Sequence, residues 1–176
     1  HPKRAQILAE NVVKFGHPEV VVTNNYAIDY QRAGLRFGLI LADMPCSGEG
    51  MFRKDPESIG EWSPANVEKC AALQRSILAD IWPCLLPGGL LIYSTCTFNA
   101  HENEDNIAFA VEELGAEPVA IPVEEAWQVA GPLTGPHPIC RFIPGTTRGE
   151  GLAVALLRKP ETAADLPSRD RGKGRT

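Results

Sequence analysis

Two segments of the chain place apolar residues at the spacing of an amphipathic helix. The first covers Pro2–Phe15, and Gly16 follows it as a stop signal. The second covers Pro64–Ile81, and Ser63 before it is an N-cap residue followed directly by a proline in the first helical position. Pro83 has no backbone N–H and is expected to end or kink this helix. The pattern therefore predicts two helices with sharp boundaries.

A third helix is predicted over residues 99–114. Asn99 is an N-cap residue, and Glu102, three residues later, supplies the acid of a capping box. Apolar residues at helical spacing then continue to about Leu114. The segment is therefore expected to enter a helix directly at Asn99.

Three short aliphatic runs lack the polar alternation of a half-exposed strand. Such runs are typical of strands in a parallel sheet that is covered on both faces. They are residues 19–23, Phe37–Asp43 and 90–98, the last entered through a Gly-rich turn at 85–89. Residues 117–121 are interpreted as a further strand.

The C-terminal part begins with residues 122–138, which are rich in Gly and Pro and are expected to form a loop. "CRFIP" (140–144) and "GLAVALLRK" (151–159) then predict two strands joined by a turn at 145–150. Strands alternate with helices before this pair. The sequence therefore predicts an α/β domain with a mainly parallel sheet that closes in an antiparallel hairpin.

Length and composition fit one ordinary globular domain. The chain has 176 residues, of which 44% are hydrophobic and 22% charged, and its formal net charge is -5. This acidic balance gives no overall attraction to nucleic acid. Basic residues gather only in "SRDRGKGRT" at 168–176, a run without apolar residues. We therefore expect a solvated tail or linker over residues 161–176.

The sequence also bounds the setting of the protein. No window approaches the roughly 20 consecutive apolar residues of a membrane helix, and the N-terminus has no apolar signal region. A cytoplasmic protein without a membrane partner is expected. The five cysteines are odd in number, widely spread and without a Cys-x-x-Cys pair. They therefore predict neither a disulfide framework nor a metal site. The sequence leaves the oligomeric state open.

Residues able to carry chemistry gather where the three predicted parallel strands end. Ligands of open α/β sheets bind in the crevice beyond the carboxyl ends of the strands. These ends carry "TNN" (23–25), "DMPCSGEG" (43–50) and "STCT" (94–97). If the second and third strands are neighbours, Cys46 and Cys96 face one crevice, where neither thiol is needed to fill a core. The other cysteines are interpreted as core or bystander residues: Cys70, Cys84 and Cys140.

Several residues near the first thiol have two interpretations. Asp43 could accept hydrogen bonds from an ammonium or amide group, or it could be a cap or turn acid. Arg53 and Lys54 could contact a phosphate or remain solvated. Gly48 and Gly50 allow a sharp turn or a close approach of the backbone to a ligand. Composition and spacing do not decide among these.

A set of motifs resembles one enzyme family. The motifs are "DMPCSGEGMFRKDP" from Asp43, "WSP" from Trp62, Gln74, "LLPGGLLIYSTCTFNAHENED" from Leu85, and "RFIP" with "GEGLAVALLRK" near the end. Together they resemble the RNA 5-methylcytosine methyltransferases of the Sun/Fmu type, most of all the bacterial ribosomal RNA branch. The resemblance covers about residues 1–159 and includes both cysteine motifs in the family's order.

The resemblance implies transfer of a methyl group from S-adenosylmethionine, the cofactor, to carbon 5 of a cytosine in RNA, with ribosomal RNA as the expected partner. In the family the nucleophile matches Cys96, whose thiolate adds to carbon 6 and makes carbon 5 nucleophilic. The thiol that assists the later elimination matches Cys46. Asp43 matches a residue at the methionine end of the cofactor. Asn25 matches a position beside the adenine, where the family usually has an acid.

The same resemblance implies a Rossmann-like class I methyltransferase fold whose first strands are missing. The family's glycine-rich cofactor loop, its ribose-binding acid, a lysine near the target base and the RNA-docking region are expected before His1. Residues 1–160 would then be the C-terminal part of the catalytic domain. The isolated chain is expected to bind the cofactor poorly and to be inactive.

Three other hypotheses compete with this one. Amino-methyltransferases end the corresponding strand with an acid or Asn, Pro-Pro and an aromatic residue, whereas this chain has a thiol at Cys46. DNA cytosine methyltransferases use the Pro-Cys thiol as nucleophile, which would exchange the roles of Cys46 and Cys96. A catalytically silent RNA-binding or assembly module could also keep the fold. The second cysteine motif argues against the DNA enzyme, and retention of both thiols argues against the silent module.

Overall fold

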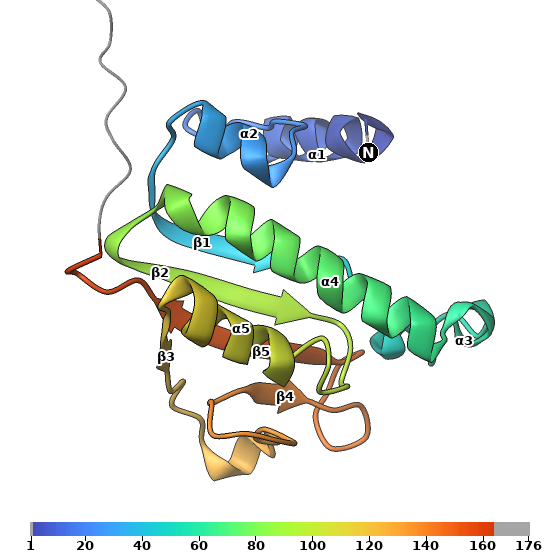
Figure 1. Cartoon of the computed structure of the whole chain (residues 1–176). Coiled ribbons are helices and arrows are strands. Elements are labelled where there is room, and N and C mark those ends of the chain that lie inside the picture. The colour runs from blue at the N-terminus through green and yellow to red at the C-terminus, as the bar shows by residue number, and fades with distance from the viewer. Residues whose placement is uncertain (1, 164–176) are drawn as a thin grey trace, which may run out of the picture.

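In the computed structural model, which describes residues 2–163, a five-stranded sheet forms the centre of the molecule (Figure 1). Its strands are β1 (Phe37–Asp43), β2 (Leu85–Thr95), β3 (Glu117–Val119), β4 (Cys140–Phe142) and β5 (Leu152–Arg158). The α-helices are α1 (Pro2–Phe15), α2 (Ala27–Arg32), α3 (Glu57–Glu61), α4 (Pro64–Ile81) and α5 (Glu104–Leu114). Three short 3-10 turns are η1 (Glu49–Met51), η2 (Trp82–Cys84) and η3 (Glu125–Trp127).

The sheet has the order β1-β2-β5-β3, and β4 also pairs with β5. β1 and β2 run parallel, whereas β5 runs antiparallel to β2, β3 and β4. Four of the five strands therefore share one direction. This confirms the prediction of an α/β domain with mainly parallel strands, and the β4–β5 pairing confirms the antiparallel hairpin near the C-terminus.

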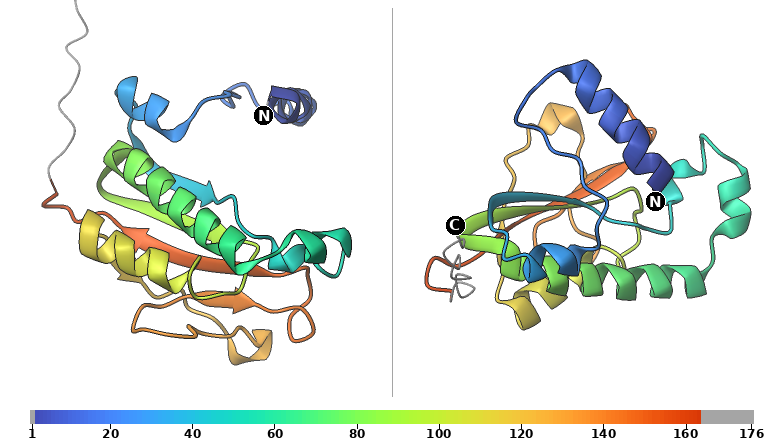
Figure 2. Two further views of the ribbon diagram at one scale, coloured as in Figure 1. Left: turned by 45° about the vertical axis from the view of Figure 1, so that its right-hand side comes forward. Right: turned by 90° about the horizontal axis from the view of Figure 1, so that it is seen from above.

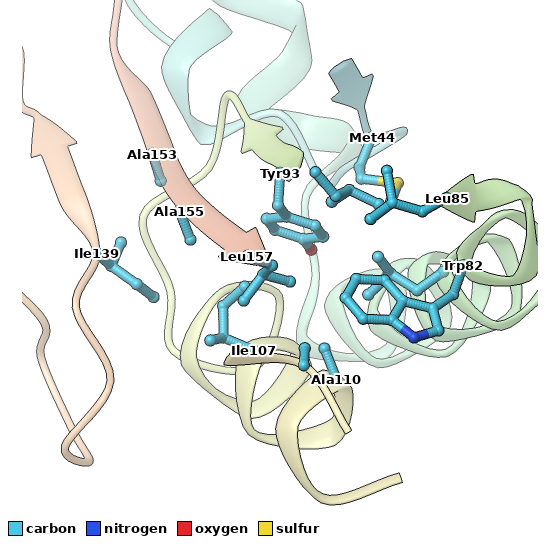
Figure 3. Packing of buried hydrophobic residues seen from close by; sticks show 13 residues of the cluster. Met44, Trp82, Leu85, Tyr93, Ile107, Ala110, Ile139, Ala153, Ala155 and Leu157 are labelled. Atoms are coloured by element: carbon cyan, nitrogen blue, oxygen red, sulfur yellow. The ribbon is translucent and has the colours of Figure 1, made fainter. Parts of the chain in front are cut away.

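The hydrophobic core lies between the sheet and the neighbouring helices α4 and α5, which cover the same face (Figures 1 and 2). Leu78 of α4 and Ile107 of α5 are fully buried in one cluster with Leu91 and Tyr93 of β2. Figure 3 shows the Tyr93 ring among these side chains, with Leu157 of β5 beside it. Each fully buried aliphatic side chain contributes about 1.5–3 kcal/mol. This packing fixes β2, whose end leads to Cys96.

Both ends of α4 agree with the prediction. Ser63 caps the helix, because its hydroxyl accepts the Asn66 N–H at 3.2 Å, and Pro64 occupies the first turn. The helix ends at Ile81, directly before the 3-10 turn η2 that contains Pro83. α1 also matches the prediction over Pro2–Phe15.

The third helix begins later than predicted. α5 starts at Glu104 rather than at Asn99. The Asn99 side chain does accept the Glu102 N–H at 2.9 Å, but these residues close a separate turn before the helix. The side-chain amide of Asn103 donates hydrogen bonds to the carbonyls of Thr97 and Asn99, at 3.2 and 2.8 Å. The segment 99–103 is therefore tied to the end of β2 instead of extending α5.

The prediction of a strand at residues 19–23 is wrong. These residues are irregular and largely exposed, with Val21 81% exposed. An extended segment becomes a strand only when a neighbour takes up its backbone hydrogen bonds. Among the residues that the structure describes, none pairs with 19–23. The β propensity of residues 19–23 is therefore not enough to form a strand without a neighbouring strand.

Residues 85–89, predicted as a turn, instead form the first part of β2. The register between β1 and β2 shifts between Phe37 and Leu39, which marks an irregularity opposite the two glycines of this segment. Gly88 has a φ of +74°, and a Cβ on Gly89 would lie 2.8 Å from the Leu86 carbonyl oxygen. The glycines thus let the strand bend without ending it.

β1 is covered on one face only by the described residues. Ile40 and Ala42 pack against the core, whereas Leu39 and Leu41 are 59% and 68% exposed. This departs from the expectation of burial on both faces. The reason is that α4 and α5 cover the same face of the sheet, so the side chains of β1 that point to the other face stay exposed.

Two further expectations concern the C-terminal tail and membrane spans. The predicted tail at 161–176 lies almost wholly outside the described residues. Within residues 2–163, no helix combines the length and apolar character needed to span a membrane.

Candidate active site

The parallel pairing of β1 and β2 brings the two cysteine motifs together. Asp43, the last residue of β1, lies opposite Ser94 of β2. Cys46 and Cys96 follow within three residues of this pair, and their sulfur atoms lie 3.0 Å apart in hydrogen-bonding contact. Both side chains are partly buried rather than sealed in the core. The structure therefore joins the two thiols that the sequence places 50 positions apart.

The contact shifts the pKa values of the two thiols in opposite directions. The hydrogen bond from Cys46 is the main cause that lowers the pKa of Cys96, to about 7, although burial and the carboxylates of Asp43 and Glu102 oppose it. The same hydrogen bond, with burial, raises the pKa of Cys46 far above its ordinary value. Of the two thiols, Cys96 is therefore the one that ionises near neutral pH, and Cys46 is the thiol that donates to its thiolate form.

A carboxylate connects the two motifs. Glu49, three residues after Cys46, accepts the backbone N–H groups of Phe98 and Asn99 at 2.6 and 3.1 Å. It also accepts the Asn99 side-chain amide at 3.0 Å and the indole N–H of Trp62 at 3.2 Å. Partial burial raises the pKa of Glu49, but these hydrogen bonds outweigh it and hold the pKa below its usual value. An ionised Glu49 thus fixes the loop after Cys96.

A second carboxylate, Glu102, is fully buried beneath the loop that carries Cys46. It accepts the Ser47 N–H at 3.0 Å, the Gln74 amide at 2.8 Å and the Asn99 amide at 2.9 Å. Gln74 also donates to the Pro45 carbonyl at 2.8 Å. Hydrogen bonds to Gln74 and Glu102 therefore hold the backbone on both sides of Cys46, at Pro45 and Ser47.

Gly50 permits the closest approach between the two motifs. Its N–H donates to the Cys96 carbonyl at 2.7 Å. A Cβ at this position would lie 2.7 Å from that carbonyl oxygen and 2.9 Å from the Glu150 carbonyl oxygen. Any larger residue would force these backbones apart. Glycine is required here by space, and no strained backbone angle is involved.

Arg53 and Lys54, considered above as phosphate contacts or solvated residues, bind the protein itself. The Arg53 guanidinium donates to the Gly149 carbonyl at 3.0 Å, and the Lys54 ammonium lies 3.3 Å from the Glu150 carboxylate. Both contacts are exposed, so each contributes little to stability. Their geometry ties the segment after Cys46 to the turn before β5.

Asp43 is one of the residues that line a hollow of about 420 Å³ beside β1. The hollow is lined mainly by apolar side chains, including Leu41 and Met44, and by Tyr30. Ser94 donates to one oxygen of the exposed Asp43 carboxylate at 3.2 Å, which leaves the other oxygen able to accept from a ligand. Asn25 is exposed and is not part of this lining. The structure thus joins Asp43 to the thiols but does not join Asn25 to them.

Comparison with known proteins identifies the family. The family model for the 16S rRNA methyltransferase RsmB/F matches residues 1–158. The chain belongs to this family.

Individual members of the RsmB/F family show how much of a protein this chain represents. The ribosomal RNA small subunit methyltransferase F of Escherichia coli O9:H4 (strain HS) is 34% identical over 169 residues, which are 94% of this chain and 35% of that protein. The protein of the same name from Salmonella paratyphi A is 39% identical over 133 residues, or 75% of this chain and 28% of that protein. The chain spans about a third of the length of these curated relatives.

Solved structures agree on the fold. The crystal structure of NSun6 from Pyrococcus horikoshii with SFG matches with a TM-score of 0.77 and 28% identity, covering 90% of this chain and 39% of that one. A methyltransferase homologue from the same organism has a TM-score of 0.75 and 24% identity over 90% of this chain and 51% of its own, a likeness that shows the fold alone. The mixed sheet described above is therefore a Rossmann-like methyltransferase sheet.

The remaining cysteines of this RsmB/F chain do not take part in the Cys46–Cys96 contact. Cys84 is fully buried, Cys70 contacts the Asn66 side chain at 3.9 Å, and Cys140 begins β4. Burial raises the pKa of each of these three thiols. Within residues 2–163, no group of three His, Cys, Asp or Glu residues is arranged to hold a metal ion.

Sequence reasoning missed the two carboxylates that hold the site. Glu102 was predicted to cap a helix, and Glu49 attracted no separate prediction. The signal for Glu102 was the density of polar residues in "NAHENED", which exceeds what one helix cap requires. Gln74 appeared only as part of the resemblance, although a fully buried glutamine in an amphipathic helix requires polar partners.

Proposed function

We propose that the protein to which this chain belongs methylates carbon 5 of a cytosine in RNA, with the 16S ribosomal RNA as the substrate class. The family and the names of the small-subunit methyltransferases support the RNA class. The observation that carries the proposed chemistry is the 3.0 Å contact between the Cys96 and Cys46 sulfurs at the ends of adjacent parallel strands. One thiolate and one thiol at this position suit a reaction that needs a nucleophile and a proton donor or acceptor.

The first step in this proposal is addition of the Cys96 thiolate to carbon 6 of the target cytosine. Carbon 5 of a cytosine is a poor nucleophile in the aromatic ring. Addition of sulfur at carbon 6 breaks the aromaticity and shifts electron density to carbon 5, which can then take a methyl group. A pKa of Cys96 near 7 keeps a large share of this residue in the thiolate form at neutral pH.

Cys46 serves the opposite half of the reaction in this proposal. The carbon–sulfur bond to Cys96 must break after the carbon-5 proton has left, and the departing sulfur is then again a thiolate. Cys46 is positioned to donate its hydrogen bond to that sulfur as charge returns to it. Its raised pKa keeps it protonated for this purpose.

S-Adenosylmethionine, when bound, supplies the methyl group as an electrophilic sulfonium. The SFG in the crystal structure of the NSun6 relative is an analogue of this cofactor, which supports the choice. Asp43 fits the amino-acid end, because its carboxylate is exposed beside the thiols and keeps one oxygen free for an ammonium group. Asn25 is exposed and polar and is proposed to lie nearer the adenine.

The proposal is tested with the complete parent protein. The protein is mixed with S-adenosylmethionine and 16S ribosomal RNA containing 5-fluorocytidine, and a covalent protein–RNA adduct is sought on a denaturing gel. Fluorine cannot leave carbon 5 as a proton does, so the adduct to Cys96 is trapped after methyl transfer. We expect an adduct in the wild type and in Cys46→Ala, and none in Cys96→Ala.

Each other result has a defined meaning. An adduct that needs Cys46 but survives Cys96→Ala would exchange the roles of the two thiols. RNA binding without any adduct, in a protein shown to be folded and to bind the cofactor, would overturn the enzymatic proposal and favour the silent binding module. Cys70→Ala serves as the matched control, because this thiol contacts the Asn66 side chain and not Cys46 or Cys96.

A further inference from the structure

The contact between Cys46 and Cys96 suits a reaction other than methyl transfer. A disulfide requires a sulfur–sulfur separation of about 2.05 Å, so closing the 3.0 Å contact needs a movement of only about 1 Å. Cys46 and Cys96 both lie outside the β1–β2 register, so a movement of this size leaves that pairing intact. Partial exposure of both side chains leaves them accessible to a small oxidant.

The surrounding hydrogen bonds hold the two thiols together in the reduced protein. Glu49 fixes the segment after Cys96, and Glu102 fixes the peptide after Cys46. The hydroxyls of Ser47 and Thr97, each directly following one cysteine, also contact one another at 3.1 Å. The two sulfurs are therefore prepositioned, and little chain entropy remains to be lost when they are joined.

The two thiols also have complementary reactivity. A thiolate, and not a thiol, attacks a peroxide, and the hydrogen bond from Cys46 lowers the pKa of Cys96. A second thiol in contact with the oxidised sulfur can then resolve it. The pKa values of the other three thiols are raised instead, at Cys70, Cys84 and Cys140. Cys70 contacts the Asn66 side chain, Cys84 is buried in the core, and Cys140 begins β4.

We propose that Cys46 and Cys96 are a modification site at which a peroxide forms a reversible intramolecular disulfide. The Cys96 thiolate attacks one peroxide oxygen, the oxygen–oxygen bond breaks, and hydroxide leaves while Cys96 becomes a sulfenic acid. The Cys46 sulfur then attacks the Cys96 sulfur, and the sulfenic oxygen leaves as water with the Cys46 proton. Two thiols and one hydrogen peroxide give one disulfide and two water molecules, so both sulfurs are oxidised and the peroxide oxygens are reduced.

The disulfide does not depend on the proposed function, but its consequence does. If Cys96 is the nucleophile of the methyl transfer, the disulfide removes the thiolate that must add to the cytosine. Oxidation would then switch the enzyme off, and a reducing thiol would restore it. The bond would also protect Cys96 from irreversible oxidation to sulfinic and sulfonic acids.

The test uses the complete parent protein without RNA or cofactor. The folded protein is treated with one equivalent of hydrogen peroxide, the remaining thiols are blocked, and the protein is digested without reduction for mass spectrometry. We expect a peptide pair joined through Cys46 and Cys96, blocked and unlinked thiols at Cys70, Cys84 and Cys140, and recovery of the free thiols of Cys46 and Cys96 after dithiothreitol. Cys70→Ser is the matched control and should form the same bond at the same rate.

Two cysteine variants and a comparison with adduct activity make the test decisive. Cys46→Ser should prevent the disulfide and leave a sulfenic acid on Cys96 that dimedone traps. Cys96→Ser should leave Cys46 unoxidised. The proposal is overturned if wild-type protein yields sulfinic or sulfonic acid on Cys96 without a linked peptide, or if the linked peptides join other cysteines. In the complete parent, disulfide formation without any adduct activity would instead refute the proposed function and leave the modification site standing.

Discussion

Replacing Gly50 with alanine tests whether close backbone contact sets the geometry of the thiol pair. The added Cβ would lie 2.7 Å from the Cys96 carbonyl oxygen and 2.9 Å from the Glu150 carbonyl oxygen. Both obstacles are backbone atoms, so neither can rotate away as a side chain would. Carbon–oxygen contacts in proteins lie near 3.3–3.6 Å, so the Cys96 carbonyl must retreat by about 0.6 Å or more and the Glu150 carbonyl by about 0.4 Å or more.

The expected size of the effect follows from two costs. Overpacking of this kind destabilises by about 1–3 kcal/mol. The 2.7 Å hydrogen bond from the Gly50 N–H to the Cys96 carbonyl is stretched as well, at about 0.5–1.5 kcal/mol. We expect the free energy of unfolding to fall by about 2 kcal/mol, which corresponds to about 4–8 °C in Tm for a domain of this size.

The effect on chemistry is expected to exceed the effect on folding. A displacement of about 1 Å in a reacting group can cost about 100-fold in rate, so a shift of about half that size should slow adduct formation by about tenfold. The rate is measured with 5-fluorocytidine RNA in the parent protein at a temperature where the variant is fully folded. Gly60→Ala is the control, because no atom lies within 4 Å of its added Cβ and the residue lies in α3.

Gly60→Ala should be neutral or slightly stabilising, because alanine favours a helix over glycine by about 1 kcal/mol. The reasoning is refuted if Gly50→Ala keeps both its Tm and its adduct rate within the range of the Gly60→Ala control. A lowered Tm with an unchanged adduct rate would show that the Gly50 contact stabilises the loop without setting the position of Cys96.

Three further predictions address the charges and the helix cap around the site. Glu102→Leu should lower the free energy of unfolding by about 3 kcal/mol in urea titration, because it removes the acceptor of the buried Ser47 N–H and one acceptor each of the Gln74 and Asn99 amides. Glu102→Gln should cost less than half as much; equal losses would contradict this role. The rate of adduct formation should rise with pH through about 7, since Cys96 reacts as the thiolate that forms above its lowered pKa. Cys46→Ala should move this midpoint upward; a midpoint that stays near 7 in the variant would contradict the hydrogen bond from Cys46 as the cause of the lowered pKa. Ser63→Ala should destabilise by about 1 kcal/mol in the same titration, while Ser63→Asp keeps the cap to the Asn66 N–H; identical losses would remove the cap as the cause.

Much of the fold was readable because local patterns and tertiary packing agree. The Ser63-Pro64 cap, the stop at Pro83 and the strand at Phe37–Asp43 each rest on residues whose conformational preferences the surrounding structure also favours. The strand predicted at 19–23 failed because β propensity needs a partner strand, and propensity alone cannot supply one. The helix predicted from Asn99 begins only at Glu104, because the polar residues before it make hydrogen bonds among themselves and to the end of β2 instead of to a helix terminus.

The candidate site divides in the same way. The sequence by itself determined which residue types are present at the strand ends, namely two thiols, the acid Asp43 and a pair of glycines, because these residue types sit where apolar runs stop. Only the tertiary structure decided that Cys46 and Cys96 touch, since that depends on β1 and β2 being parallel neighbours in one register. It also decided that Glu49 and Glu102 hold the two loops, because a hydrogen bond between residues some 50 positions apart forms only where packing brings them together.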